Sequence, residues 1–318
     1  MRYLITGGAG FIGSHLVSKI IDNAEKIIVL DNLLTGSKKN INKYLDLSNF
    51  QFISHDIQNH YDPEENIDCV IHLASCASPV AYAENPINTL KSGSIGTINS
   101  LGIARKYNSS FLLASTSEIY GDPKISPQHE EYWGNVNPVG PRSMYDESKR
   151  FAEAATQAYI TEYKLNAKIV RIFNTYGPNM KLDDGRVVTN FIVQALKNKD
   201  ITVFGKGLQT RSFSYVDDTV NGIMLASSYK EPDIFNIGND NEITINQLAQ
   251  TIIDITNTKS KIIYKDLPKD DPLQRKPDLR KSKELLNYEH DDNPRRFSSG
   301  CLQNLLHKFL TTDFDIEV

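Results

Sequence analysis

A glycine-rich turn between a short apolar run and a helix is the feature that most restricts how this chain can fold. The run covers residues 3–6, and Thr-Gly-Gly-Ala-Gly-Phe-Ile-Gly follows at once as residues 6–13. Gly7 permits a tight turn, Gly10 lets backbone amides approach a pyrophosphate, and Gly13 lets the helix pack closely on the strand. A glycine triplet alone is often an ordinary turn, but the strand–turn–helix context predicts a dinucleotide site.

Short apolar runs alternate with helical patterns through the first half of the chain. Runs that are typical of buried parallel strands occupy residues 3–6, 26–30, 50–53, 68–73 and 111–115. Apolar residues recur at helical spacing between the first two runs, which completes a β-α-β unit with a right-handed connection. We therefore predict an α/β fold with a doubly wound parallel sheet, the Rossmann architecture.

After residue 173 the sequence changes to loop-rich segments with scattered short strands and helices. We expect a dinucleotide-binding domain at residues 1–173 and a smaller, mainly substrate-binding α/β part at residues 174–318, with some chain crossing back to the first. Two helical stretches, residues 96–107 and 145–163, carry small or apolar residues on more than one face. This pattern indicates that each helix packs on the sheet and also on a partner.

Composition limits the classes of ligand and the location. The chain of 318 residues has 35 Lys and Arg against 39 Asp and Glu, so its net charge of −4 offers no general basic field to nucleic acid or an anionic membrane. The cysteines, Cys69, Cys76 and Cys301, are too sparse for a disulfide framework and fit a reducing compartment. Because no long apolar run occurs and the chain turns at residue 7, we expect a cytoplasmic protein with neither a membrane span nor a signal peptide.

The second apolar run is followed by a carboxylate. Asp31 stands where a strand-end carboxylate accepts hydrogen bonds from the adenosine ribose hydroxyls of a dinucleotide. Asn32 comes next and no Arg lies beside it, which favours NAD over NADP. The alternative is a solvated Asp at the end of a strand.

Tyr145 and Lys149 lie four residues apart in a predicted helix and therefore share a face. A nearby ammonium group, together with an oxidised nicotinamide, would lower the pKa of Tyr145 from its ordinary value of about 10. A tyrosine of this kind serves as a general base at neutral pH. The alternative is a tyrosine packed on an amphipathic helix.

Polar side chains follow the fifth apolar run. Ser115-Thr116-Ser117-Glu118 comes at the carboxyl end of a parallel strand, where open α/β sheets bind ligands. Hydroxyl groups at such a place often only cap the strand end. Glu118, in contrast, is a candidate general acid or base if the site closes around it.

Basic residues in the second half of the chain are candidates for binding anions. Guanidinium groups make two-pronged contacts with phosphate or carboxylate, which singles out Arg186, Arg211 and Arg275, with Lys181 beside them as a further cation. Surface solvation is the usual explanation for any one of them.

The spacing of Cys69, His72 and Cys76 superficially resembles a metal cluster. Residues 69 and 72 of a strand point to opposite faces, however, so we expect no metal site here.

Longer motifs along the chain resemble a known family. They are residues 113–123, 132–138, 140–142, 171–178, 184–188, 209–213 and 270–278, which read LASTSEIYGDP, YWGNVNP, GPR, RIFNTYGP, DGRVV, QTRSF and DDPLQRKPD. With the glycine turn and the Tyr/Lys pair, they resemble the extended short-chain dehydrogenase/reductases that modify nucleotide sugars. Within that family, the Thr-Ser-Glu and Arg275 segments resemble the UDP-glucuronate decarboxylases, or UDP-xylose synthases. The similarity runs from residue 1 to about residue 290.

The resemblance implies an NAD-dependent carboxy-lyase that converts UDP-glucuronate to UDP-xylose through a 4-keto intermediate and regenerates NAD. Tyr145 would deprotonate the hydroxyl on sugar carbon 4, Thr116 would hold its oxygen, and Lys149 would hold the cofactor ribose and the phenol. The ketone then lies β to the carboxylate, so carbon dioxide leaves as electrons enter an enolate. Glu118 and Arg275 resemble the family's pair for decarboxylation and reprotonation.

The resemblance also implies which residues contact the ligands and how the chain assembles. The cofactor contacts, partly also indicated by the glycine turn and the Tyr/Lys pair, would be Gly7, Gly10, Phe11, Ile12, Gly13, Asp31, Asn32, Thr35, Gly36, Asp56, Ile57, Leu73, Ser75, Ala114, Tyr145, Lys149, Thr175 and Arg186. The substrate contacts would be Pro79, Tyr82, Glu118, Asn174, Arg211 and Arg275. A homodimer would form through a four-helix contact of the two stretches at residues 96–107 and 145–163.

Other functions remain open at this point. A 4-epimerase of another nucleotide sugar needs only Thr116, Tyr145 and Lys149. A 4,6-dehydratase is less favoured, because that branch typically has an Asp-Glu pair where this chain has Ser117-Glu118. From another class, a catalytically silent NAD-binding sensor or assembly subunit is opposed by the complete Thr/Tyr/Lys set.

Overall fold

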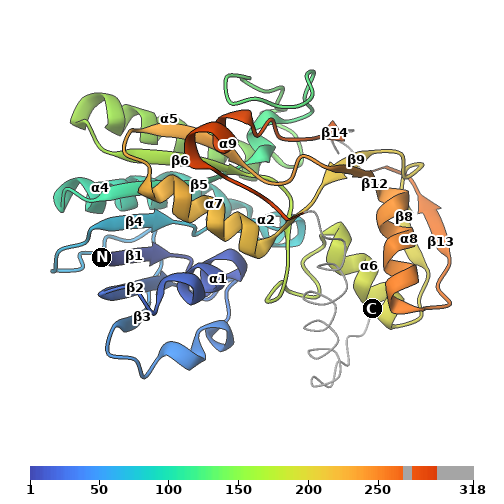
Figure 1. The fold of residues 1–318 in the computed structure, drawn as a ribbon, viewed down its shortest axis with the longest axis horizontal. Coiled ribbons are helices and arrows are strands. Elements are labelled where there is room, and N and C mark those ends of the chain that lie inside the picture. The colour runs from blue at the N-terminus through green and yellow to red at the C-terminus, as the bar shows by residue number, and fades with distance from the viewer. Residues whose placement is uncertain (268–273, 292–318) are drawn as a thin grey trace.

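The structure is a computed structural model that describes residues 1–267 and 274–291 (Figure 1). Cys301 and the first four residues of the 270–278 motif lie outside the described residues, as does the end of the expected second part after residue 291.

The larger part of the described chain is built on a seven-stranded parallel sheet with the order β11-β6-β5-β4-β1-β2-β3. Its strands are β1 (Arg2–Thr6), β2 (Lys26–Asp31), β3 (Phe50–Ser54), β4 (Cys69–His72), β5 (Ser110–Thr116), β6 (Ala167–Ile172) and β11 (Asp233–Ile237). The apolar runs predicted as strands match β1 to β5 to within two residues, because strands buried on both faces are apolar throughout. The predicted fold class is confirmed.

Helices cover both faces of this sheet (Figure 1). On one face, α1 (Phe11–Ile20) packs against α7 (Val216–Ser228), and side chains such as Leu16 and Ile223 are fully buried between them and the sheet. On the other face, α4 (Thr97–Lys106) packs against α5 (Ser143–Tyr163) over a second core. A π-helix, η3 (Ser92–Gly96), precedes α4. The two predicted helical stretches agree with α4 and α5.

The smaller part lies beside the carboxyl ends of the sheet strands (Figure 1). Its helices α6 (Val187–Leu196) and α8 (Ile245–Thr256) share a core that is separate from those of the large sheet. Its short sheets pair β7 (Thr175–Tyr176) with β10 (Ser214–Tyr215), β8 (Ile201–Phe204) with β13 (Ile262–Lys265), and β9 (Thr210–Ser212) with both β12 (Glu242–Thr244) and β14 (Gln274–Arg275).

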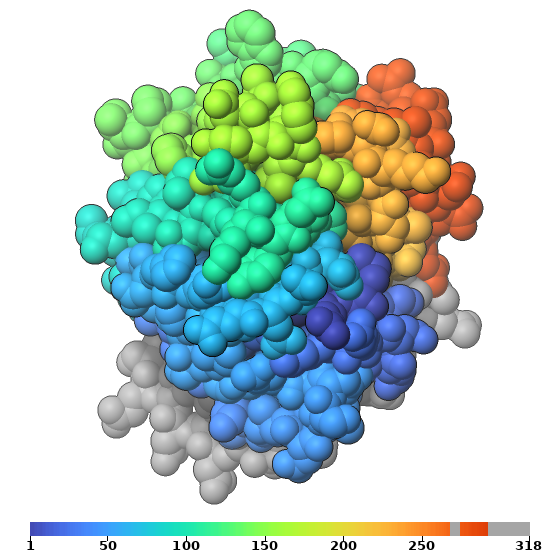
Figure 2. Space-filling model, turned by 90° about the vertical axis from the view of Figure 1, so that its left-hand side faces the viewer, coloured from blue at the N-terminus to red at the C-terminus, as the bar shows by residue number. Residues whose placement is uncertain are grey.

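The remaining short elements connect these layers. They are α2 (Pro79–Glu84), α3 (Pro86–Lys91), α9 (Arg280–Leu286), η1 (Lys38–Asn40), η2 (Asn42–Tyr44) and η4 (Ser117–Tyr120). The chain returns to the large sheet after residue 215, because α7 packs on α1 and β11 extends the sheet beyond β6. Figure 2 shows this return as orange residues beside the dark blue N-terminal residues. The large part is therefore discontinuous in sequence.

The order of the strands in the large sheet indicates where a ligand site lies. Along the chain, β1, β2 and β3 follow one another to one side, whereas β4, β5 and β6 follow to the other. The direction of winding changes between the neighbours β1 and β4, and ligands of open α/β sheets bind at the carboxyl ends beside such a point. Among the described residues, no helix is both long and apolar enough to cross a membrane.

Candidate active site

A cavity of about 1060 Å³ opens at this point between the large sheet and the smaller part. The turns after β1, β4, β5 and β6 line one side of it, and residues of α6, β8, β9 and β14 line the other. Every residue expected to contact cofactor or substrate lines this cavity, with the exception of Gly36. Gly36 lies next to the lining residue Asp31, since a Cβ on it would come 3.0 Å from the Asp31 Oδ1 atom.

The glycine turn has the geometry that its sequence predicts. Gly7 has a φ of +73°, in the left-handed region that favours glycine. A Cβ on Gly13 would lie 2.2 Å from the carbonyl oxygen of Gly7, so only glycine allows α1 to start this close to β1. Gly10, Phe11 and Ile12 bring the N-terminus of α1 to the cavity wall, where its amides and dipole suit a pyrophosphate.

Asp31 ends β2 at the cavity wall and is buried. Its carboxylate accepts hydrogen bonds from the backbone N–H groups of Ala9 (3.0 Å) and Leu33 (2.8 Å). Burial raises the pKa of Asp31, and these two donors oppose the rise. The carboxylate is therefore fixed in place beside the glycine turn.

Two further observations fit a nucleotide here. Asn32 donates to the Asp56 carboxylate over 3.2 Å, which joins the turns after β2 and β3. The Oγ atom of Ser75, in the turn after β4, is buried without a hydrogen-bond partner among the residues that the structure describes, and Ser75 lines the cavity. An unpartnered buried hydroxyl fits a site that a polar ligand completes. The residues present therefore fit a dinucleotide cofactor.

The first two turns of α5 carry Tyr145 and Lys149, both almost fully buried, at the cavity. The Lys149 Nζ atom donates to the carbonyl oxygen of Ala114 on β5 over 2.8 Å. The ring of Tyr145 stacks on that of Tyr82 from α2, with centroids 5.3 Å apart and an interplanar angle of 14°. Thr116 at the end of β5 lines the same cavity, so the structure brings together the expected Thr/Tyr/Lys set.

The expected lowering of the pKa of Tyr145 involves both an ammonium group and an oxidised nicotinamide, and it stays a prediction for the cofactor-bound protein. Burial raises the pKa of Tyr145 above its ordinary value, and a hydrogen bond with Thr116 opposes this rise. The Lys149 ammonium is directed to the Ala114 carbonyl, and its own pKa is lowered to about 8 because burial penalises the charge. Desolvation is therefore the largest influence on the pKa values of both Tyr145 and Lys149.

The lowered pKa of Lys149 predicts a dependence of stability on pH. Unfolded Lys149 holds its proton up to its ordinary pKa of 10.5, whereas the folded residue loses it at about 8. The free energy of unfolding of the wild type should therefore rise, relative to a Lys149→Met variant, between those pH values, by at most about 3 kcal/mol. Urea denaturation of both proteins across this pH range measures the difference between their free energies of unfolding. A difference that does not change with pH would contradict the prediction.

Glu118 lies in η4, and its carboxylate forms ion pairs with Arg275 and with Arg142. Burial alone would raise its pKa, but Arg275 and Arg142 outweigh burial and lower it to about 2. Glu118 is therefore ionised at neutral pH, which makes it a carboxylate base and an anchor for cations. The alternative role of general acid does not fit this state.

Arg275 comes from β14 of the smaller part and is only 2% exposed. Besides Glu118, its Nη2 donates to the Gly121 carbonyl oxygen over 2.8 Å, and its Nη1 donates to Ser117 Oγ over 3.4 Å. Its Nε is buried without a hydrogen-bond partner among the described residues. Arg275 lines the cavity, so this buried cation contributes positive charge to it.

Arg142 is a site residue that the sequence reasoning missed. It directly precedes α5, three positions before Tyr145, and lies in the family-like 140–142 motif, which was the available signal. Asp146, four positions after Arg142 and within α5, is buried and does not line the cavity, but its charge is coupled to that of Glu118. Burial and the negative charge of Glu118 raise the pKa of Asp146 to about 7, and Arg142 opposes the rise.

The other expected residues lie as follows. Pro79 and Tyr82 come from α2, and Asn174 and Thr175 from the turn after β6. Arg186, Arg211 and Lys181 line the cavity from the smaller part. The Arg186 Nη2 atom donates to the Ala77 carbonyl oxygen over 2.9 Å and so joins the two parts.

His72 is buried in β4 and hydrogen-bonds through Nδ1 with Thr6 Oγ1 at 2.7 Å and with Ser100 Oγ at 3.2 Å. Burial lowers its pKa to about 3, so the ring is neutral. Cys76 packs against Tyr82 and Tyr145. Within the described residues, no group of three or more His, Cys, Asp and Glu is arranged to hold a metal ion.

Comparisons with known proteins agree with this geometry. The description "NAD dependent epimerase/dehydratase family" matches residues 3–238. UDP-glucuronic acid decarboxylase 1 of Xenopus tropicalis is 48% identical over 288 residues, which cover 91% of this chain and 68% of that protein. UDP-glucuronic acid decarboxylase 5 of Arabidopsis thaliana is 49% identical over 290 residues, which cover 91% of this chain and 84% of that protein.

A solved structure is similar throughout. It is UDP-glucuronic acid 4-epimerase from Bacillus cereus in complex with UDP-glucuronic acid and NAD, with a TM-score of 0.86 at 26% identity, covering 97% of this chain and 100% of that one. The resemblance read from the motifs is confirmed, and this chain belongs to the NAD-dependent epimerase/dehydratase family.

Proposed function

We propose that this chain decarboxylates UDP-glucuronate to UDP-xylose in one catalytic cycle that uses bound NAD. The observation that carries the proposal is the ion pair of Glu118 with the buried Arg275, which lies in the same cavity as Thr116, Tyr145 and Lys149. An epimerase needs only the last three residues. The relatives that are 48% and 49% identical are UDP-glucuronic acid decarboxylases, which supports the same substrate.

The first step is oxidation at sugar carbon 4. When bound, NAD supplies reversible oxidation and reduction of that carbon. Tyr145 takes the proton of the 4-hydroxyl, and Thr116 binds the same oxygen at the end of β5. Burial raises the pKa of Tyr145, so the base form of this residue needs the positive charge of the oxidised nicotinamide, which would favour the phenolate. Tyr145 returns the proton to the same oxygen at the end of the cycle.

The second step removes the carboxylate. The ketone on carbon 4 lies β to the carboxylate, so the bond from carbon 5 to the carboxylate breaks, carbon dioxide leaves, and the electron pair passes into an enolate. The cations of Arg275 and Arg142, which both line the cavity, would stabilise the negative charge of this enolate. Glu118 orients Arg275, and a solvent-derived proton goes to carbon 5. One proton is consumed for each carbon dioxide released.

Proton NMR of the purified protein with UDP-glucuronate, with and without added NAD, tests the function. We expect the carbon 5 proton signal of UDP-glucuronate to give way to those of UDP-xylose. In deuterated water carbon 5 should gain one deuterium, since the new proton comes from solvent. A product that keeps its carboxylate and is inverted at carbon 4 would identify a 4-epimerase instead, and unchanged substrate would also contradict the proposal.

Asp31 predicts a preference for NAD over NADP. The 2′-phosphate of NADP would lie against the fixed Asp31 carboxylate, so we expect its Kd to exceed that of NAD by at least about tenfold. An Asp31→Ala variant should lose most of this preference. Calorimetric titration of the wild type and of the variant with each nucleotide measures this preference as the ratio of the two Kd values.

Asp68→Ala is the matched control for the NAD preference. Asp68 also accepts a backbone hydrogen bond, from Arg2 over 2.7 Å, but it lies at the amino end of β4, outside the cavity. This variant should keep the wild-type preference. Equal affinities of the wild type for the two nucleotides would contradict the role of Asp31.

The expected homodimer and location are part of the same proposal. Ile87 on α3, Ile95 in η3, Ile98 on α4 and Phe151 on α5 are exposed apolar residues along adjoining elements, which supports a self-association face there. The sparse cysteines support a cytoplasmic location.

A further inference from the structure

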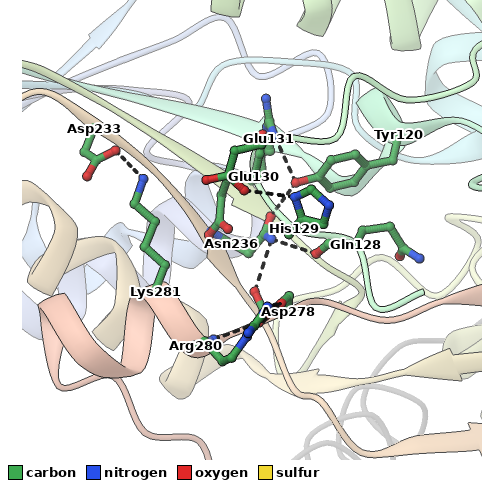
Figure 3. Close-up of polar contacts among 11 residues, drawn as sticks. Tyr120, Gln128, His129, Glu130, Glu131, Asp233, Asn236, Asp278, Arg280 and Lys281 are labelled. Carbon is green, nitrogen blue, oxygen red and sulfur yellow. Dashed lines mark hydrogen bonds and ion pairs between the residues drawn. The ribbon is translucent and has the colours of Figure 1, made fainter. Parts of the chain in front are cut away.

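Asn236 is a fully buried polar residue of β11 that no step of the proposed reaction uses. Its Nδ2 atom donates to the carbonyl oxygens of Gln128 (3.0 Å) and Asp278 (3.2 Å), and its Oδ1 accepts from the Tyr120 hydroxyl over 2.8 Å (Figure 3). Both donors and the acceptor of one amide are therefore used. They join segments that lie far apart in the sequence.

The Tyr120 contact reaches the segment that carries Glu118. Tyr120 is the last residue of η4, two positions after Glu118, and is fully buried. Its hydroxyl also accepts from Arg171 Nη1 over 2.9 Å, so its position is fixed from two sides. Within the turn, the Gly121 N–H donates to the Glu118 carbonyl oxygen over 2.9 Å. Fixing Tyr120 therefore fixes the backbone from which Glu118 extends.

The Gln128 and Asp278 contacts reach the segment that carries Arg275. The backbone N–H of Gln128 donates to the Lys276 carbonyl oxygen (2.8 Å), its carbonyl oxygen accepts from the Asp278 N–H (2.8 Å), and its Oε1 accepts from the Lys276 N–H (2.9 Å). Gln128 is fully buried. Gln128 thus holds residues 276–278, which directly follow Arg275. Asn236 joins the two segments, because it donates to the carbonyl oxygens of both Gln128 and Asp278.

We infer that Asn236 is a positioning residue that sets Glu118 and Arg275 against each other, and that it acts on decarboxylation more than on oxidation at carbon 4. Only an amide offers two donors and an acceptor in one plane, which is what these contacts require. Of the residues of the oxidation step, Tyr145 is held by α5, and Thr116 is the last residue of β5, where its Oγ1 also accepts the Glu118 N–H over 3.2 Å. The inference rests on the proposed function.

An Asn236→Asp variant tests the inference. The change keeps the shape and the acceptor for Tyr120 but removes both donors. Rapid mixing of the NAD-loaded enzyme with UDP-glucuronate gives the rate of nicotinamide reduction, and trapped carbon dioxide gives the rate of decarboxylation. We expect the ratio of decarboxylation to reduction to fall by about tenfold or more, with the oxidised sugar accumulating, since small misplacements of catalytic groups have effects of this size.

Tyr120→Phe is a second variant in case Asn236→Asp does not fold. It removes the hydroxyl that donates to Asn236 while it keeps the ring. Tyr288→Phe is its matched control, because Tyr288 is equally buried and donates one hydrogen bond over 2.8 Å, to the Gly238 carbonyl oxygen. Both variants should lose similar thermal stability, but only Tyr120→Phe should lower the ratio.

The outcomes separate the inference from the function on which it rests. A folded Asn236→Asp or Tyr120→Phe protein with the wild-type ratio would overturn the inference, as would an equal fall in Tyr288→Phe. Equal slowing of both steps would overturn it as well, because it would indicate a merely structural role. A wild type that releases no carbon dioxide would overturn the proposed function itself.

Discussion

A Tyr145→Phe variant should lose about 10² to 10⁴-fold in kcat for UDP-glucuronate, while its KM changes little. The substitution removes the phenol oxygen that takes the proton of the 4-hydroxyl and leaves the ring, which still stacks on Tyr82. Without an acceptor for that proton, oxidation at carbon 4 cannot begin, so nicotinamide reduction should fall together with carbon dioxide release. Initial rates of both, measured over a range of substrate concentrations, give kcat and KM.

Tyr44→Phe is the matched control for this loss. Tyr44 has the same 6% exposure as Tyr145 but packs in the core beneath β2 and β3 and does not line the cavity. We expect wild-type kinetics from this variant. A Tyr145→Phe protein with more than about a tenth of the wild-type kcat would exclude Tyr145 as the general base.

Loss of Arg275 should lower both the free energy of unfolding and the rate of carbon dioxide release. An Arg275→Met variant leaves the Glu118 carboxylate without its most buried partner, so we expect the free energy of unfolding to fall by about 3 to 5 kcal/mol. Carbon dioxide release should fall by about 10² to 10³-fold, as is usual when a donor to a developing oxyanion is removed. Urea denaturation and trapped carbon dioxide measure the two effects.

A double variant separates the two effects of Arg275. Adding Glu118→Gln to Arg275→Met removes the carboxylate that the first change leaves with Arg142 as its remaining ion-pair partner, so part of the lost stability should return, but turnover should not. Arg280→Met is the control for loss of an ion pair, because Arg280 is 81% exposed where it pairs with Asp278, and pairs exposed to solvent contribute little to stability. A double variant with wild-type turnover would remove the Glu118–Arg275 pair from the mechanism.

The parts of the fold that the sequence predicted correctly depend on local patterns of residues. The strands β1 to β5, the helices α4 and α5 and the Gly7 turn each depend on residues close together in the chain. Their signals are apolar runs, helical spacing and glycine where a Cβ would clash, and these follow from backbone geometry alone. The site residues predicted at strand ends reach one cavity because all carboxyl ends of a parallel sheet lie at the same edge.

Contacts between distant segments were decided only by the tertiary structure. The sequence by itself determined the Rossmann sheet, the dinucleotide turn and the Tyr145–Lys149 spacing, because regular periods and turn chemistry are local. The fold alone decided that Arg142 joins Glu118 and Arg275, that Lys149 binds the Ala114 carbonyl, and that Asn236 links the segments of the ion pair. It also decided that desolvation is the largest influence on the pKa of Tyr145 in the protein alone, because desolvation depends on everything packed around a group and no spacing along the chain encodes it.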